Sequence, residues 1–391
     1  MEPELQLTAE EDRPTTDRAA ADQAGSASRV PEPGEGWGGP SYGPGHGNDG
    51  FDWIFIGPEG LRAGCSILLF YGLYWLFRIV VGTIFYGAGL VGDTVGDSAP
   101  SVFFVELIPF ISMIAAAAIL ALLERRRLLS YNLTGPRRAL HFVVGAVAGF
   151  VALSLLIAML AFGGWLRFAP AAISAGPALR SAAMWGAAFL IVACVEEGLF
   201  RCFGLFTLTR GINFWWALLA EIAVCADVAV HARSNGAWGV YLAALLGLVP
   251  CFVLQQRAVT SSAFWQAAWV TSTFFGFYHT LNSGENWIGV FAAALIGFVL
   301  CVSVRLTGSA WWAIGFHAAW DWAETFFYGT ADSGLTAQGN LLSASPAGNP
   351  LWSGGTDGPE GSLLVIGVVL ALLLFVLAVY GRRRGATAIG A

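Results

Sequence analysis

The sequence predicts an all-α fold, a polytopic transmembrane helix bundle with about 8–10 spanning helices. Of its 391 residues, 56% are hydrophobic and only 12% are charged, whereas soluble domains have about 25% charged residues. Apolar stretches of about 20 residues recur along the chain, and each is long enough to cross a bilayer as a helix. These stretches make the lipid bilayer an expected partner, and no nucleic-acid partner is expected. The net charge of −6 comes mostly from the N-terminal tail and indicates nothing about nucleic acid.

Residues 1–52 precede the first apolar stretch and are polar, acidic and rich in proline and glycine. Such a segment cannot bury enough apolar area to offset the entropy lost when it becomes ordered. We therefore expect a disordered acidic N-terminal tail.

Hydropathy predicts ten spans with ends uncertain by a few residues. The spans are residues 60–92, 101–123, 140–163, 182–208, 213–230, 237–256, 263–282, 286–306, 309–328 and 361–381. We group them into N-terminal helices (60–164), a core (182–328) with an insert (213–256), a flexible Gly/Ser/Pro-rich loop (329–360) and a C-terminal helix (361–381). The insert is the least secure part, because its first span is near the lower length limit for crossing.

Arginines predict the orientation of the chain. They cluster at residues 125–127 and 137–138, after the second span, and at residues 382–384, after the last. Short loops rich in arginine remain in the cytoplasm. An even number of spans places both clusters and the N-terminal tail on that side, so both termini are expected to be cytoplasmic.

Two adjacent acids lie in the fourth apolar stretch. Glu196 and Glu197 are followed by Arg201, although each acid at membrane depth costs at least a few kcal/mol. Glu197 and Arg201 are four residues apart, so they share a helix face and can pair. Glu196 is turned about 100° away and is free to face another group.

Two later spans carry histidines with partners at the same spacing. His279 follows Phe275 by four residues, and Asp321 follows His317 by four. A carboxylate beside an imidazole sets its tautomer and raises its basicity. Because ionisable groups avoid lipid, they are expected to face the bundle interior. Converging helices would bring them and Glu196 around one water, which provides the groups for hydrolysis with or without a metal.

A simpler interpretation is that these groups form structural hydrogen bonds between helices, each worth under about 1 kcal/mol on average. Asp227 and His231, with Glu221 earlier in the helix, form a second cluster. Its position before a polar loop favours a helix end over a catalytic site. Glu106 and Glu324 are likewise interpreted as interfacial or structural.

Three motifs, in this order, resemble those of the CPBP family of CAAX proteases and bacteriocin-processing enzymes, also called the Abi family. EExxxR corresponds to residues 196–201, FxxxH to residues 275–279 and HxxxN/D to residues 317–321. The resemblance covers about 182–328 and includes the type II CAAX prenyl proteases. It implies an all-helical intramembrane endopeptidase in a bacterial inner membrane that acts on a peptide or protein substrate. The substrate, the cleavage site and the oligomeric state are not indicated.

The resemblance also implies roles for the motif residues. Glu196 would activate a water with help from His279. His317 and Asp321 would stabilise the oxyanion or complete the water or metal site. Glu197 and Arg201 would hold the site together or contact substrate. If a divalent metal such as zinc takes part, its candidate ligands are Glu196, His279 and His317.

Two features depart from the family pattern. About 80 residues separate the first two motifs, which is longer than usual and reflects the insert at 213–256. Asp321 stands where several members carry asparagine, so its role as oxyanion donor or as partner of His317 remains open.

Two other functions compete with proteolysis. A non-catalytic membrane scaffold or bacteriocin-immunity protein could keep the same groups as structure. A proton-coupled transporter could use them as a relay, although they cluster in three spans and the sequence shows no inverted repeat.

Overall fold

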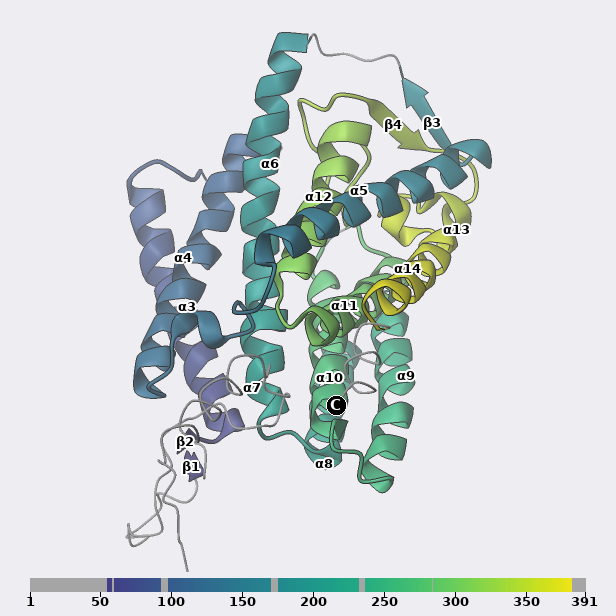
Figure 1. The fold of residues 1–391 in the computed structure, drawn as a ribbon. Helices are drawn as coiled ribbons and strands as arrows, with labels where there is room; N and C mark the ends of the chain where they lie inside the picture. Colours follow the sequence, from purple (N-terminus) through teal and green to yellow (C-terminus); the bar gives the residue numbers. More distant parts are fainter. Residues whose placement is uncertain are drawn as a thin grey trace, which may run out of the picture. The chain divides into compact units, whose positions relative to one another are not determined.

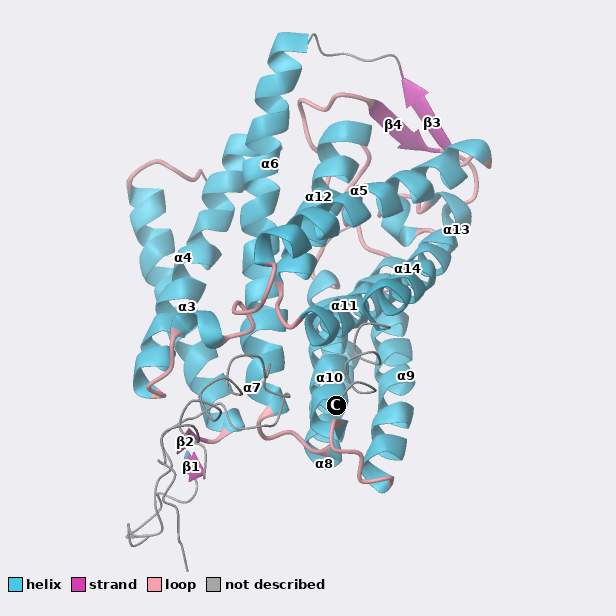
Figure 2. Ribbon diagram, in the orientation of Figure 1, coloured by secondary structure: helices cyan, strands magenta, loops and turns pink. Residues whose placement is uncertain are grey.

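The computed structural model describes residues 55–57, 60–92, 98–169, 175–231, 236–282 and 284–381, and these residues are predominantly helical (Figures 1 and 2). All of them belong to the unit Tyr42–Ala391. The expected disordered tail and the arginines at 382–384 lie outside the described residues. The described residues also form two short two-stranded antiparallel sheets. One pairs β1 (Ile56–Gly57) with β2 (Gly60–Leu61), and the other pairs β3 (Leu166–Ala169) with β4 (Ser343–Pro346).

Within the described ranges, eight helices are long and apolar enough to cross a membrane. They are α3 (Ala63–Gly87), α4 (Ala99–Leu123), α5 (Arg138–Phe162), α8 (Phe214–His231), α9 (Ala237–Gln256) and α11 (Trp287–Thr307), together with Gly176–Thr209, formed by α6, η2 and α7, and Leu363–Gly381, formed by α14 and η5. The predicted all-α polytopic fold is confirmed, and the chain is an integral membrane protein.

Two of the ten expected spans are not among these eight helices. They are α10 (Ser262–His279) and α12 (Trp311–Trp322), which continues into the π-helix η3 (Ala323–Tyr328). Helix α10 buries Gln266 and Thr273 and packs against α7, α8, α9 and α11. Helix α12 is short and packs against α5, α6 and α11. Both helices are surrounded by protein, which can satisfy polar side chains that lipid would leave without partners.

Glycines fix the contact between α5 and α12, which cross in Figure 1. A Cβ atom at Gly145 would lie 2.1 Å from the Trp312 carbonyl oxygen, and one at Gly149 would lie 2.2 Å from that of Phe316. On α12, a Cβ at Gly315 would lie 2.1 Å from the Phe142 carbonyl oxygen. Small residues spaced in this way let membrane helices approach backbone to backbone, and here they position the helix that carries His317 and Asp321.

The insert at 213–256 consists of α8 and α9, and both are among the eight helices of spanning length. The two helices pack against each other and against α10. Val224 and Val228 of α8 are buried with Val240 of α9 and Val290 of α11. The insert therefore adds a helical pair beside α10.

The segment 329–360 contains β4, the short helix α13 (Pro350–Ser353) and the 3₁₀ turn η4 (Pro359–Gly361). Asn349 caps α13 by accepting a hydrogen bond from the Leu351 N–H. Asp357 is fully buried and accepts a hydrogen bond from the Asn286 N–H at 3.1 Å. The segment thus packs on the start of α11, while its expected flexibility stays a prediction.

Candidate active site

The two adjacent glutamates end α6 (Ala175–Glu197), where the chain continues as the π-helix η2 (Gly198–Gly204) and then α7 (Leu205–Thr209). π-Helical turns are rare and often occur at functional sites. Gly198 allows a close approach, because a Cβ there would lie 2.4 Å from Met113 Sδ of α4. The first motif therefore lies where the α-helix becomes a π-helix and packs closely against α4.

Glu197 and Arg201 form the expected pair in the protein interior. Both side chains are fully buried, and Arg201 Nη1 donates to Glu197 Oε1 at 3.1 Å. His317 Nδ1 lies 2.9 Å from the same oxygen. The Arg201 guanidinium also lies over the Phe275 ring, 4.1 Å from its centroid. These contacts tie the three motifs together through one buried carboxylate.

One cavity of about 350 Å³ brings the other expected residues together. Glu196 from α6, His279 from α10, and His317 and Asp321 from α12 all line it. His317 Nε2 lies 3.7 Å from Glu196 Oε2 and 3.4 Å from Asp321 Oδ2. Glu197 and Arg201 do not line the cavity. The expected set thus divides into four residues at the cavity and two in the interior behind it.

The tautomer of His279 follows from its hydrogen bond. His279 Nδ1 lies 2.8 Å from the Phe275 carbonyl oxygen. Because a carbonyl oxygen only accepts, Nδ1 must carry the proton, which leaves Nε2 of a neutral ring as an acceptor. The Phe275 ring packs edge-on against the imidazole at 4.7 Å between centroids, as the four-residue spacing predicts.

The cavity also contains polar residues that the sequence analysis did not assign to it. Asn282, three residues after His279, lines the cavity, as does Glu106 of α4, which was interpreted as interfacial or structural. Asp332 and Glu360 reach it from the segment 329–360. Helical spacing from His279 could have indicated Asn282, but no local pattern indicates the other three.

The second predicted cluster lies at the end of α8. His231 Nδ1 is 2.9 Å from Asp227 Oδ1, and the two side chains are 71% and 47% exposed. Glu221 is buried elsewhere on the same helix. The exposure of Asp227 and His231 agrees with their interpretation as a pair at the end of a helix.

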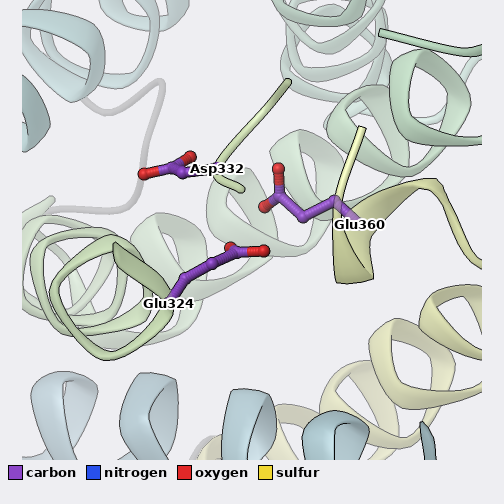
Figure 3. Close-up of side chains that lie close together, drawn as sticks. All are labelled: Glu324, Asp332 and Glu360. Atoms are coloured by element: carbon purple, nitrogen blue, oxygen red, sulfur yellow. The ribbon is translucent and has the colours of Figure 1, made fainter. Parts of the chain in front are cut away.

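The carboxylates that lie closest together as potential metal ligands are not the residues that the sequence analysis named as metal candidates. Among the described residues, the three potential ligands whose atoms lie within 4.8 Å of one another are Glu324, Asp332 and Glu360, and they do not include Glu196 or the two histidines (Figure 3). One nitrogen of His317 faces Glu197 in the interior. Glu196, His279 and His317 line one cavity, and a divalent metal held by them stays a prediction.

A comparison with protein families identifies part of this site. Residues 251–323 match the family model described as type II CAAX prenyl endopeptidase Rce1-like. This part of the chain is an Rce1-like domain. It runs from the end of α9 through α12, and so it holds His279, His317 and Asp321. The expected resemblance to the CPBP family is confirmed for this segment, and membership of that family implies an intramembrane protease of the CAAX type.

The Rce1-like match ends short of the first motif, since residues 196–201 lie before it. The comparison with curated proteins gave no match, and neither did the comparison with solved structures. The hydrogen bond from His317 to Glu197 nevertheless joins the Rce1-like segment to α6 in space. The first motif is thus connected to the domain by geometry.

Proposed function

We propose that this protein is an intramembrane endopeptidase of the CAAX protease type in which Glu196 activates the attacking water. The observation that carries this proposal is the different surroundings of the two adjacent glutamates. The Glu196 side chain is 20% exposed and lines the cavity, whereas that of Glu197 is fully buried against Arg201 and His317. A general base must reach a water that also reaches the substrate, and Glu196 satisfies this condition.

The chemistry needs one proton to move. Glu196 takes a proton from the water as the water oxygen bonds to the scissile carbonyl carbon. The same proton then passes to the leaving amine as the carbon–nitrogen bond breaks. The unprotonated Nε2 of His279 can orient the water by accepting its second hydrogen.

His317 and Asp321 act on the other side of the reacting carbonyl. Nδ1 of His317 faces the Glu197 carboxylate, so it donates its proton there. Nε2 faces the carboxylates of Glu196 and Asp321. A proton held between His317 Nε2 and Asp321 can be offered to the oxyanion, and the Glu196 carboxylate stays free to take the proton of the water. Asp321 therefore serves by keeping a proton close to His317 Nε2.

Glu197 and Arg201 are positioning residues in this proposal. Neither is exposed to the cavity, so contact with substrate is not required of them. Their role is to hold the ring of His317 in the orientation in which Nε2 faces Glu196. We further propose that the arginines at 125–127 and 137–138 face the cytoplasm of a bacterial inner membrane.

The proposal is tested with two peptide substrates, a fluorescent farnesylated CAAX peptide and its non-prenylated counterpart. Purified full-length protein should cleave at least one of them. Glu196→Ala and His279→Ala should lower the cleavage rate about 100- to 10,000-fold while the protein still elutes and unfolds as the wild type does. Glu221→Gln changes a buried acid that does not line the cavity and serves as the control.

Full activity in both alanine variants would contradict the proposal. A wild-type protein that cleaves neither peptide would favour the scaffold or immunity function. Proton-driven flux in reconstituted vesicles would favour the transporter instead.

A further inference from the structure

Three carboxylates meet beyond the end of α12. Glu324 belongs to η3, Asp332 to the segment that follows, and Glu360 to η4. One carboxylate oxygen from each lies within 4.8 Å of the other two. Figure 3 shows the carboxylates of Glu324 and Glu360 facing each other, with Asp332 beside them.

Among the described residues, no hydrogen bond or ion pair compensates a charge on Glu324. Its side chain is fully buried, and neither carboxylate oxygen has a hydrogen-bond partner. Burying an unpaired carboxylate costs several kcal/mol. Because one of its oxygens lies within 4.8 Å of an oxygen of each of the other two acids, like charges make this cost larger.

The other two carboxylates are held in place by neutral donors. Asp332 Oδ2 accepts from Thr325 Oγ1 at 3.0 Å. Glu360 accepts from Trp320 Nε1 at 2.8 Å and from Ser333 Oγ at 2.9 Å. Among the ion pairs of the described residues, none includes a member of this trio. The arrangement orients three acids around a common space without supplying a positive side chain.

We propose that Glu324, Asp332 and Glu360 bind a hard divalent cation, Ca²⁺, Mg²⁺ or Mn²⁺. An all-oxygen ligand set selects these ions over zinc or copper. Oxygens bound to one Ca²⁺ lie at most roughly 5 Å apart, because Ca–O distances are about 2.3–2.6 Å, and the observed spacing fits this limit. The remaining positions would be filled by water.

The ion would act on the structure and on the cavity. It would fasten η4 and the segment 329–360 to the end of α12, the helix that carries His317. Asp332 and Glu360 also line the cavity, so a bound cation would offset their negative charge beside the reacting groups.

The test is a titration of full-length, EDTA-treated protein in detergent with MnCl₂, in which free Mn²⁺ is measured by electron paramagnetic resonance. We expect one saturable Mn²⁺ per chain, displaced by CaCl₂ or MgCl₂. Glu324→Gln should weaken binding at least tenfold. Asp332→Asn, at a half-buried loop position, should do the same and remains informative if Glu324→Gln does not fold.

Glu221→Gln is the matched control, because it changes an acid of similar burial on α8, outside the cluster, and it should leave binding unchanged. The proposal is overturned if the wild type binds no saturable Mn²⁺ between pH 6 and 8, which would mean that protons neutralise the acids. It is also overturned if Asp332→Asn binds as the wild type does. No substrate enters the measurement, so its outcome is independent of the proteolytic function.

Discussion

The chain buries acids in two places and compensates them in different ways. At the end of α6, Glu197 has Arg201 at 3.1 Å and His317 at 2.9 Å. Beyond α12, Glu324 is equally buried but faces Asp332 and Glu360 (Figure 3). The first cluster carries its positive charge in the sequence, four residues away. The second has no ion pair among the described residues and in our proposal takes its positive charge from a bound cation. The contrast is between a self-contained ion-pair cluster and a proposed ion site.

The largest expected effect comes from breaking the self-contained cluster. Arg201→Met leaves Glu197 buried with only a histidine beside it, and loss of one partner of a buried pair costs roughly 3–5 kcal/mol. Thermal unfolding in detergent should therefore show a large loss of stability or a failure to fold. The control is Arg78→Met, which replaces an arginine of α3 that donates a hydrogen bond to Tyr74. If Arg201→Met unfolds at the same temperature as Arg78→Met, the pair of Glu197 and Arg201 is not needed for stability.

A smaller effect is expected at the contact between α5 and α12. Helix α12 carries His317 of the first cluster and Trp320, which donates a hydrogen bond to Glu360 of the second. In Gly149→Ala the new Cβ would lie 2.2 Å from the Phe316 carbonyl oxygen, and the resulting overpacking costs roughly 1–3 kcal/mol. Peptide cleavage should fall as well, because α12 positions His317. Gly72→Ala is the matched control, since a Cβ there meets nothing within 4 Å. The account is wrong about this contact if both variants behave alike.

A third comparison concerns two acids that lie beside the start of α11. A Cβ on Gly289 would meet both Asp357 and Glu285. Burial raises the pKa of Asp357 to about 8, although the Asn286 N–H opposes the shift. The unfolded pKa is about 3.9, so the folded state binds more protons between the two values. The contribution of Asp357 to the free energy of unfolding is therefore fully present below about pH 4, and it is lost as the pH rises through 8.

Melting temperatures measured at pH 5 and pH 8 test this dependence. The wild type should melt at a lower temperature at pH 8, and Asp357→Asn should show a clearly smaller difference. A difference of the same size in the variant would assign the pH dependence to other groups.

The sequence predicts those features that are local along the chain. Apolar length predicts most spans, and four-residue spacing predicts the contacts of Glu197 with Arg201 and of His279 with Phe275. Hydropathy counted α10 and α12 as spans, but they are not among the eight described helices of spanning length and apolarity. Protein neighbours surround both helices, and a hydropathy pattern cannot show this. The residues Glu324, Asp332 and Glu360 come from three separate segments, so no spacing rule joins them. Glu324 was accordingly interpreted as structural or interfacial from its own surroundings alone.

The central claim is that adjacent glutamates have different tasks, and paired measurements on Glu196→Gln and Glu197→Gln test it most directly. Cleavage rate and melting temperature are recorded for both variants in the same detergent. Glu196→Gln should lose at least about 100-fold in rate with a melting temperature close to that of the wild type, whereas Glu197→Gln should melt at a clearly lower temperature. A Glu196→Gln protein that cleaves at the wild-type rate would contradict the account.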